Sequence, residues 1–329
     1  MIHGWLLPHR QGNAYHRRTS RSIEIDEHLT AVNDINAIFH RLRARLQSIA
    51  YNMLGSVADA EDVVQDVWLR WHKAELSLIN NAEAWLVAAT TRVSIDHLRA
   101  LKSRREHYVG IWLPEPVLTE SPATPEQIQE RHSEVSVALL SMLERLSPDA
   151  RAAFLLREIF DASYADIAEA IDKSEDAVRQ IVHRAKTQLR DAQPRYAVSR
   201  ESHNRLVERF SQALARGEFK LMKSLLAGNA ELLGDGGGKV LSFPKPLLGG
   251  QRIAQLFYAS NLRYKGALRM ELASINGELS LLRYFHDALE SVLTIETDGE
   301  CIVRVLVQRN PEKLTRIASE LGVQLFIPL

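Results

Sequence analysis

Residues 163–190, SYADIAEAIDKSEDAVRQIVHRAKTQLR, contain two short helical patterns separated by a polar turn. In the first pattern the apolar residues Ile167, Ala168 and Ile171 share one face. Ser174 follows as an N-cap, with two acidic residues behind it, and opens a second helix. The apolar seam of that helix consists of Val178, Val182, Ala185 and Leu189. This arrangement predicts a helix-turn-helix.

The second helix of this stretch presents positive charge. Between Val178 and Arg190 its charged residues are all cations, which suits a surface that faces DNA phosphates. A surface pair of helices with a basic face is the simpler alternative, because such pairs are common. The stretch alone therefore favours DNA binding without establishing it.

The composition of the whole chain restricts the classes of protein that remain. The 329 residues include 41 Lys+Arg and 41 Asp+Glu, so the chain cannot coat nucleic acid indiscriminately and any binding depends on local patches. The length predicts two or three domains. The single cysteine, Cys301, can form neither an intramolecular disulfide nor a thiolate metal site, and we expect no cofactor. With no apolar run near the roughly 20 residues of a membrane span, we expect a cytoplasmic protein.

Upstream of the helix-turn-helix the sequence predicts three more helices. The first lies between Ile35 and Leu54 and is closed by Gly55. The second is opened by Asp59 and leaves an acidic face exposed, which suits a basic protein partner, although a solvated face is the commoner explanation. A loop over residues 75–84 precedes the third helix, whose end is strongly basic; stabilisation of the helix dipole alone could explain those cations.

The remaining segments predict a linker and a mixed domain. Residues 111–131 hold four prolines, which prevent a helix, and Trp112 beside two of them favours a docked segment over a loose one. After Pro194 the pattern changes to strands, with hairpin signals at Asn276-Gly277 and Asp298-Gly299. We expect a curved antiparallel sheet with helices on one face.

Several of these stretches resemble a known family. SVADAEDVVQDVWLRW at 56–71 and AWLVAATTRVSIDHLRA at 84–100 look like regions 2.2 to 2.4 of bacterial sigma-70-type factors, and the helix-turn-helix resembles region 4. YVGIWLPEP at 108–116, DGGGK at 235–239 and NPEKL at 310–314 are similar to signature stretches of the ECF41-type extracytoplasmic-function sigma factors. Those factors carry a C-terminal SnoaL-like (NTF2-like) extension. Three separated motifs in the right order make the resemblance specific.

The resemblance implies a multidomain fold of two all-α modules and one α+β NTF2-like cone. The expected divisions are a flexible extension over 1–27, sigma region 2 over 28–107, a Pro-rich linker over 108–133, region 4 over 134–194 and the NTF2-like domain over 195–329. It also implies an alternative sigma factor that is controlled in cis by its last domain. The implied partners are the bacterial RNA polymerase core and promoter DNA, with no membrane and no separate anti-sigma factor.

The same resemblance assigns roles to individual residues. Those expected to bind polymerase are Asp62, Gln65, Asp66 and Arg70. Those expected at the minus-ten element are Asn80, Asn81, Arg92, His97, Arg99, Arg104 and Arg105. Those expected at the minus-35 element are Arg179, Gln180 and His183 for base edges, with Arg184 and Lys186 for phosphates. Those expected to join the domains are Trp112, Pro114, Glu115, Asp235, Gly236, Gly237, Gly238, Lys239, Asn310, Pro311 and Lys313.

Two details depart from this assignment or stay open. The turn of the helix-turn-helix holds Asp172-Lys173 where many relatives use a glycine, which leaves its geometry open. The DGGGK loop is not a Walker A motif, because Val240 follows Lys239 where Ser or Thr would stand. Its glycines instead suit positive φ angles and close backbone approach.

Two other functions are possible. One is a ligand-responsive helix-turn-helix regulator that never touches polymerase. The other is a DNA-targeted enzyme, for which Tyr284, His286 and Asp287 are the candidate acid/base group in a cone that could also hold a small ligand. Strand alternation would place Tyr284 and His286 on one face and Asp287 beyond the strand end. A lone histidine near an aspartate is weak support, so we do not expect an enzyme.

Overall fold

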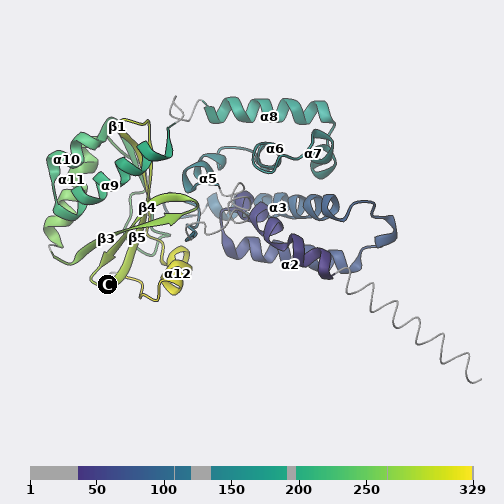
Figure 1. The fold of residues 1–329 in the computed structure, drawn as a ribbon, viewed down its shortest axis with the longest axis horizontal. Helices are drawn as coiled ribbons and strands as arrows, with labels where there is room; N and C mark the ends of the chain where they lie inside the picture. Colours follow the sequence, from purple (N-terminus) through teal and green to yellow (C-terminus); the bar gives the residue numbers. More distant parts are fainter. Residues whose placement is uncertain (1–35, 107, 120–134, 191–197, 265, 328–329) are drawn as a thin grey trace, which may run out of the picture.

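The computed structural model describes residues 36–106, 108–119, 135–190, 198–264 and 266–327. The extension expected over 1–27 and much of the linker after residue 119 lie outside the described residues. Two helical modules and a mixed domain follow one another along the chain (Figure 1).

The first helical module contains three long helices and one short turn. They are a helix over residues 36–54, α2 (Val57–Lys73), the 3-10 turn η1 (Leu76–Leu78) and α3 (Ala82–Glu106). α2 begins two residues before the predicted Asp59, because the hydroxyl of Ser56 accepts a hydrogen bond from the Asp59 amide and caps the helix. The expected inward residues Val63, Val67 and Trp71 are all buried.

The second helical module is built around the predicted helix-turn-helix. Its helices are α5 (Val137–Leu143), α6 (Pro148–Glu158), α7 (Tyr164–Ile171) and α8 (Glu175–Arg190). The four seam residues of α8 are buried, which confirms the predicted apolar face. Asp172 closes α7 in the left-handed conformation, with φ 54°. The turn therefore needs no glycine, because an aspartate is among the few residues that adopt this conformation at low cost.

The last domain wraps helices around a six-stranded sheet. Its elements are α9 (Arg200–Arg216), α10 (Phe219–Leu225), β1 (Leu226–Asp235), β2 (Leu247–Leu248), α11 (Gly250–Arg263), β3 (Leu268–Ile275), β4 (Glu278–Phe285), β5 (Ala288–Thr297), β6 (Ile302–Gln308) and α12 (Pro311–Glu320). The strand order is β2-β1-β6-β5-β4-β3, and both predicted hairpin turns join neighbouring strands. The pair β1·β6 is parallel rather than antiparallel. Parallel pairing requires a long crossover, which the segment through α11 and the four strands β2 to β5 supplies.

Both faces of this sheet are covered, whereas the sequence predicted helices on one face only. α9 and α11 pack on the first face, where Phe210, Phe257 and Val305 share a core. On the second face α12, the segment around Leu113 and the start of α5 cover Leu306. Alternating residues of β6 are apolar on both sides, so each face needs cover. The second face is thus where the mixed domain meets the rest of the chain (Figure 1).

The expected placement of His286 on a strand face with Tyr284 is wrong. β4 ends at Phe285, and His286 lies in the turn before β5 with φ 52°. Tyr284 is buried in the sheet, while His286 and Asp287 are exposed. Strand alternation gave a misleading result because the turn begins one residue earlier than the pattern suggests. The three residues form no acid/base group.

Candidate interdomain junction and nucleic-acid interface

Asp235, at the end of β1, is the centre of the contacts between the domains. Its side chain is 0% exposed and accepts hydrogen bonds from partners far away in the sequence. The Tyr108 hydroxyl donates to Oδ1 at 2.6 Å, the Leu113 amide donates to Oδ2 at 3.0 Å and Lys313 Nζ donates to Oδ2 at 2.8 Å. The three resemblance motifs therefore converge on one buried carboxylate. Lys313 supplies the positive charge that such a buried anion requires.

Two partners from the mixed domain itself complete the shell of Asp235. The Gly237 amide donates to Oδ1 at 2.9 Å, and Gln308 Nε2 donates to Oδ2 at 3.2 Å. Gln308 also reaches across the junction, where it donates to the carbonyl oxygens of Leu113 and Pro114 at 3.4 and 3.3 Å. Gln308 was missed from the sequence, because a glutamine at a strand end carries no signal of its partners.

The glycines of the DGGGK loop permit close approach, as the sequence predicted. Gly237 has φ +62°, and a Cβ atom there would lie 2.4 Å from Cγ of Asn310. At Gly236 a Cβ atom would lie 2.2 Å from the carbonyl oxygen of Val240. Real Cβ atoms do not approach other atoms so closely. A larger side chain at Gly237 would force the loop away from Asn310 at the start of α12, and one at Gly236 would disrupt the turn of the loop back to Val240.

The NPEKL motif forms the start of α12. Asn310 is its N-cap, with Oδ1 accepting from the Glu312 amide at 3.1 Å, and Pro311 occupies the first turn. The side-chain Nδ2 of Asn310 also donates to the Tyr108 hydroxyl at 3.0 Å. Lys239 and Glu312 form an exposed ion pair at the rim. Helix capping and domain contact are thus combined in one short motif.

The WLPEP segment is docked rather than loose. Lys313 Nζ lies 4.2 Å from the centroid of the Trp112 ring and donates to the Leu113 carbonyl oxygen at 2.6 Å. The other side of Trp112 contacts the first helical module, where a Cβ atom at Gly55 would lie 2.7 Å from the indole. Trp112 therefore lies between α12 and the start of α2.

Glu115 ties this segment to α2, the helix expected to bind polymerase. Its carboxylate accepts a hydrogen bond from the Val57 amide at 2.8 Å, at the positive end of the helix dipole. Its backbone N–H donates to the Gly55 carbonyl at 2.8 Å, and its own carbonyl accepts from the Tyr51 hydroxyl at 2.7 Å. Burial raises the pKa of Glu115, although the Val57 amide opposes that shift. α2 is thus capped by a residue from the linker.

The tip of the β3–β4 hairpin forms a second contact between the domains. Asn276 Oδ1 accepts from the Val117 amide at 2.9 Å, while Nδ2 donates to the Tyr51 hydroxyl at 2.8 Å and to the Val135 carbonyl at 3.3 Å. One side chain therefore joins the first module, the linker and the entry to the second module. The Asn-Gly signal marked the turn, but nothing in the sequence indicated that this turn would be buried between domains.

The face of α2 expected to meet polymerase is open. Its members Asp62, Gln65, Asp66 and Arg70 are all exposed. The neighbouring Glu61 is occupied, because Arg316 of α12 donates to it at 2.7 Å. The mixed domain thus contacts the edge of this face and leaves its centre accessible.

Most of the expected minus-ten residues make contacts within the chain. Arg92 donates to the carbonyl oxygens of Ala170 and Glu169 at 3.1 and 2.5 Å, at the end of α7. Arg99 pairs with Asp149 of α6 at 2.8 Å. These contacts join the two helical modules, while both arginines stay exposed to solvent.

The other expected minus-ten residues do not gather into a single site. His97 lies 3.3 Å from Asp59, and Asn81 caps α3 by accepting from the Ala84 amide at 3.1 Å. Asn80 is exposed beside it. The side chains of Arg104 and Arg105 lie outside the described part of the structure. Sequence analysis also missed Arg151, which is buried and donates to the Met53 carbonyl oxygen at 2.7 Å across the two modules.

The expected minus-35 residues do share one exposed surface. Arg179, Gln180, His183, Arg184 and Lys186 are all exposed on α8. Arg179 pairs with Glu175 at 2.9 Å and stacks on the Tyr164 ring at 4.3 Å. Lys186 pairs with Glu158 at 2.7 Å. α8 lies on the side of its module away from α3, so this surface is accessible (Figure 1).

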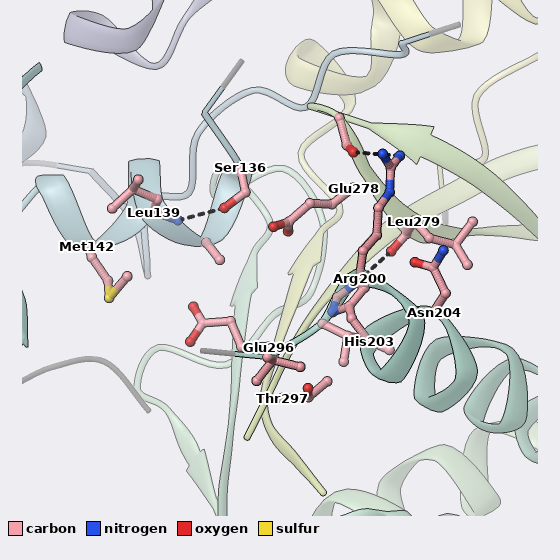
Figure 2. Close-up of a pocket in the computed structure, with 14 residues that line it drawn as sticks. Ser136, Leu139, Met142, Arg200, His203, Asn204, Glu278, Leu279, Glu296 and Thr297 are labelled. Carbon is pink, nitrogen blue, oxygen red and sulfur yellow. Dashed lines mark hydrogen bonds between the residues drawn. The ribbon is translucent and has the colours of Figure 1, made fainter. Parts of the chain in front are cut away.

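A cleft of about 570 Å³ is lined by α5, the start of α9, the start of β4 and the end of β5 (Figure 2). Two carboxylates, Glu278 and Glu296, line it together with Arg200 and His203. Burial, and then repulsion by Glu296, raises the pKa of Glu278 to about 7, against a weaker opposing effect of Arg200. Burial also raises the pKa of Glu296, despite its ion pair with Arg304. The cleft therefore places two partly buried carboxylates where they repel each other.

The elevated pKa of Glu278 predicts a pH-dependent junction. The unfolded carboxyl loses its proton near pH 4.5 and the folded one near pH 7, so stability present below pH 4.5 is lost as pH rises through 7. Part of the group is solvated, so we expect a loss of about 2 kcal/mol. The measurement is urea unfolding at pH 5 and pH 8. Glu278→Gln should remove most of the difference, and an unchanged difference would contradict the assignment.

Comparison with known proteins identifies the chain. Residues 38–104 match the model of Sigma-70 region 2, and residues 136–189 match the model of Sigma-70, region 4. The ECF RNA polymerase sigma factor SigJ of Mycobacterium tuberculosis is 37% identical over 246 residues, which are 73% of this chain and 78% of SigJ. The chain belongs to the ECF RNA polymerase sigma factors. As such it is an alternative sigma factor, which directs RNA polymerase to specific promoters.

Further similarity extends over the last domain of this sigma factor. The probable sigma factor SigI of Mycobacterium tuberculosis is 28% identical over 293 residues, covering 88% of this chain and 97% of SigI. The crystal structure of SigJ superposes with a TM-score of 0.69 at 32% identity, covering 85% of this chain and 98% of that one. Together with the mixed sheet, this likeness confirms the predicted two helical modules and the NTF2-like C-terminal domain of the ECF41-type factors.

Within the described residues, no helix is long and apolar enough to cross a membrane. The same residues contain no group of three or more His, Cys, Asp and Glu side chains that could hold a metal ion.

Proposed function

We propose that the C-terminal domain of this sigma factor inhibits it in cis. The observation that carries the proposal is the buried Asp235, which binds the WLPEP segment and α12 at once. The segment in turn caps α2, and Asn276 of the C-terminal domain joins Val117 of the linker to Val135 at the entry to the second module. In this closed arrangement the C-terminal domain holds region 2, the linker and the entry to region 4 together. Region 2 and region 4 therefore cannot separate to reach two promoter elements.

The internal contacts of the minus-ten residues support this proposal. Region 2 cations that track phosphates need free donors, and Arg92 and Arg99, although exposed, use donors of their guanidiniums to bind α7 and α6. The exposed residues of α8 would read the minus-35 element, and the exposed face of α2 would bind the polymerase core. In this state the factor offers both of those surfaces but withholds the one that melts DNA.

The proposal makes several finer statements. The divisions are region 2 over 28–107, the linker over 108–133, region 4 over 134–194 and the regulatory domain over 195–329. The factor needs no separate anti-sigma factor, because its own last domain occupies the interdomain surface. It acts in the cytoplasm with its polymerase, and its NTF2-like domain performs no catalysis.

Run-off transcription with polymerase core tests the proposal. We expect a chain cut after Val198 to give more transcript than the full chain, because the truncation removes Asp235 and α12 while retaining both helical modules. The paired substitution Asp62→Lys/Asp66→Lys should abolish transcript in both forms and prevent co-purification with the core. Equal output from the full and the cut chain would contradict inhibition in cis. Transcript that survives the paired substitution would instead contradict the assigned polymerase face.

A further inference from the structure

The C-terminal domain contains a cavity that the contacts between the domains do not use. It has a volume of about 780 Å³ and lies between α11 and the sheet face that α11 covers. Its walls are mainly apolar, with the rings of Phe257, Tyr264, Phe285 and Phe326 among them. Cavities of this size and composition are typical of sites for small organic ligands.

A buried triad of charges forms the polar part of this cavity. Glu290, whose side chain is 5% exposed, accepts from Nε of Arg283 at 2.7 Å and from Nε of Arg309 at 2.7 Å. Each arginine also contacts it through Nη2 at 2.5 Å, and the Ser291 hydroxyl donates at 2.6 Å. Burial by itself would raise the pKa of Glu290, but the two guanidiniums outweigh it and lower the pKa. The triad therefore carries one net positive charge.

This excess charge lies in a setting that favours its neutralisation. The side chains of Arg283 and Arg309 are only 11% and 23% exposed, so water compensates them poorly. Nη1 of Arg283 donates no hydrogen bond to any acceptor in the described part of the chain. Arg263, at the rim on the Tyr264 ring, adds a further cation. Glu290 is the single carboxylate among the described residues that line the cavity.

We propose that this cavity binds a small amphipathic anion, a carboxylate carried on an apolar chain or ring. The carboxylate lies against the guanidiniums of Arg283 and Arg309, whose N–H groups can donate planar bidentate hydrogen bonds to it. The apolar body lies among the aromatic rings. A neutral compound of the same shape fits the cavity but binds more weakly, because it leaves the positive charge uncompensated.

The same cavity shares a wall with the contact between the domains. Its lining includes Lys239, Val240 and Leu241, which follow the three glycines of the DGGGK loop. Arg309 connects the cavity to the contact between the domains. Its guanidinium donates to the Leu241 carbonyl oxygen, and its backbone N–H donates to the Asp235 carbonyl oxygen at 2.8 Å. A ligand carboxylate competes for the donors of Arg309. Binding therefore loosens residues 236–243 and, through them, the docked WLPEP segment.

Titration calorimetry of the full chain tests the binding step, with decanoate as the probe and decan-1-ol as its uncharged counterpart. We expect decanoate to bind and decan-1-ol to bind at least about tenfold more weakly, a difference of about 1.4 kcal/mol. Arg283→Met should weaken the binding of decanoate by a similar factor. Arg252→Met, which removes a cation from the same domain outside the cavity, should leave it unchanged. No decanoate binding, or equal binding of both compounds, would overturn the proposal.

A second variant keeps the test decisive if Arg283→Met fails to fold. Ser260→Trp, on α11, fills the cavity and leaves the charge triad intact. It should abolish decanoate binding, and binding that survives it would place the ligand elsewhere and overturn the proposal.

Hydrogen exchange tests the consequence, which rests on the proposed inhibition in cis. Saturating decanoate should speed amide exchange in residues 236–243 and 108–119, and unchanged exchange in both segments would overturn the coupling. Neither measurement involves polymerase. A negative result here therefore does not contradict inhibition in cis, and a negative transcription test of the truncated chain does not contradict ligand binding.

Discussion

Replacing Asp235 with alanine is expected to open the junction between the domains and raise transcription by the full chain. The substitution leaves Lys313 buried without its carboxylate and removes the acceptor for Tyr108 and for the Leu113 amide. Loss of one partner from a buried pair costs about 3–5 kcal/mol. Urea unfolding should report that loss, and run-off transcription with polymerase core should report the gain of activity.

The control for Asp235→Ala is a charge removed nearby at the surface. Glu312→Ala breaks the exposed ion pair with Lys239 and should cost less than about 1 kcal/mol, with little change in transcript. If Asp235→Ala destabilises the chain as expected while the transcript stays constant, the junction is structural only. Inhibition by the last domain would then be wrong.

Asn276→Gly should weaken the second contact without disturbing the hairpin. Glycine keeps the positive φ of this turn position, so the loss comes from the three hydrogen bonds of the amide. The part-buried Val117 amide and the buried Val135 carbonyl lose a partner, and we expect a cost of about 2–3 kcal/mol. Limited proteolysis within residues 108–119 should become faster, because that segment loses its anchor on the sheet.

The matched variant for this position is Asn276→Asp, which also tolerates positive φ. It retains the acceptor for the Val117 amide and removes both donors, so it should fall between the native chain and Asn276→Gly. A double-mutant cycle with Tyr51→Phe then isolates the bond between the two side chains. Additive losses in that cycle would show that the bond contributes nothing to docking.

The helical modules were well predicted from the sequence because their signals are local. The apolar face that holds Val178 and Val182 follows from helical periodicity alone. The N-cap Ser147 followed by Pro148 is recognised from residues within one turn. Asp172 marks the limit of that approach. Aspartate permits the left-handed conformation, but the sequence alone left the geometry of the turn open.

The junction was predicted as a set of motifs and not as a geometry. The resemblance brought Asp235, Trp112 and Lys313 into one list, yet no local pattern shows which atoms meet. The cross-module contacts of Asn276 and Arg151 were missed for the same reason, since the partners in those contacts lie 98 or more residues away in the chain. Long-range hydrogen bonds of single polar side chains leave no periodic trace.

If Arg92 has the proposed minus-ten role, its contact with the end of α7 turns promoter binding into a competition within one molecule. The Nε and Nη2 donors that bind the carbonyl oxygens of Ala170 and Glu169 would have to leave them to bind the phosphates of an opening duplex. DNA therefore captures only the fraction of molecules that is already open. Each 1.4 kcal/mol by which the closed form is favoured lowers the apparent affinity for the minus-ten element about tenfold. The population of the open form, rather than the contacts with DNA, then sets the threshold at which a weak promoter is used.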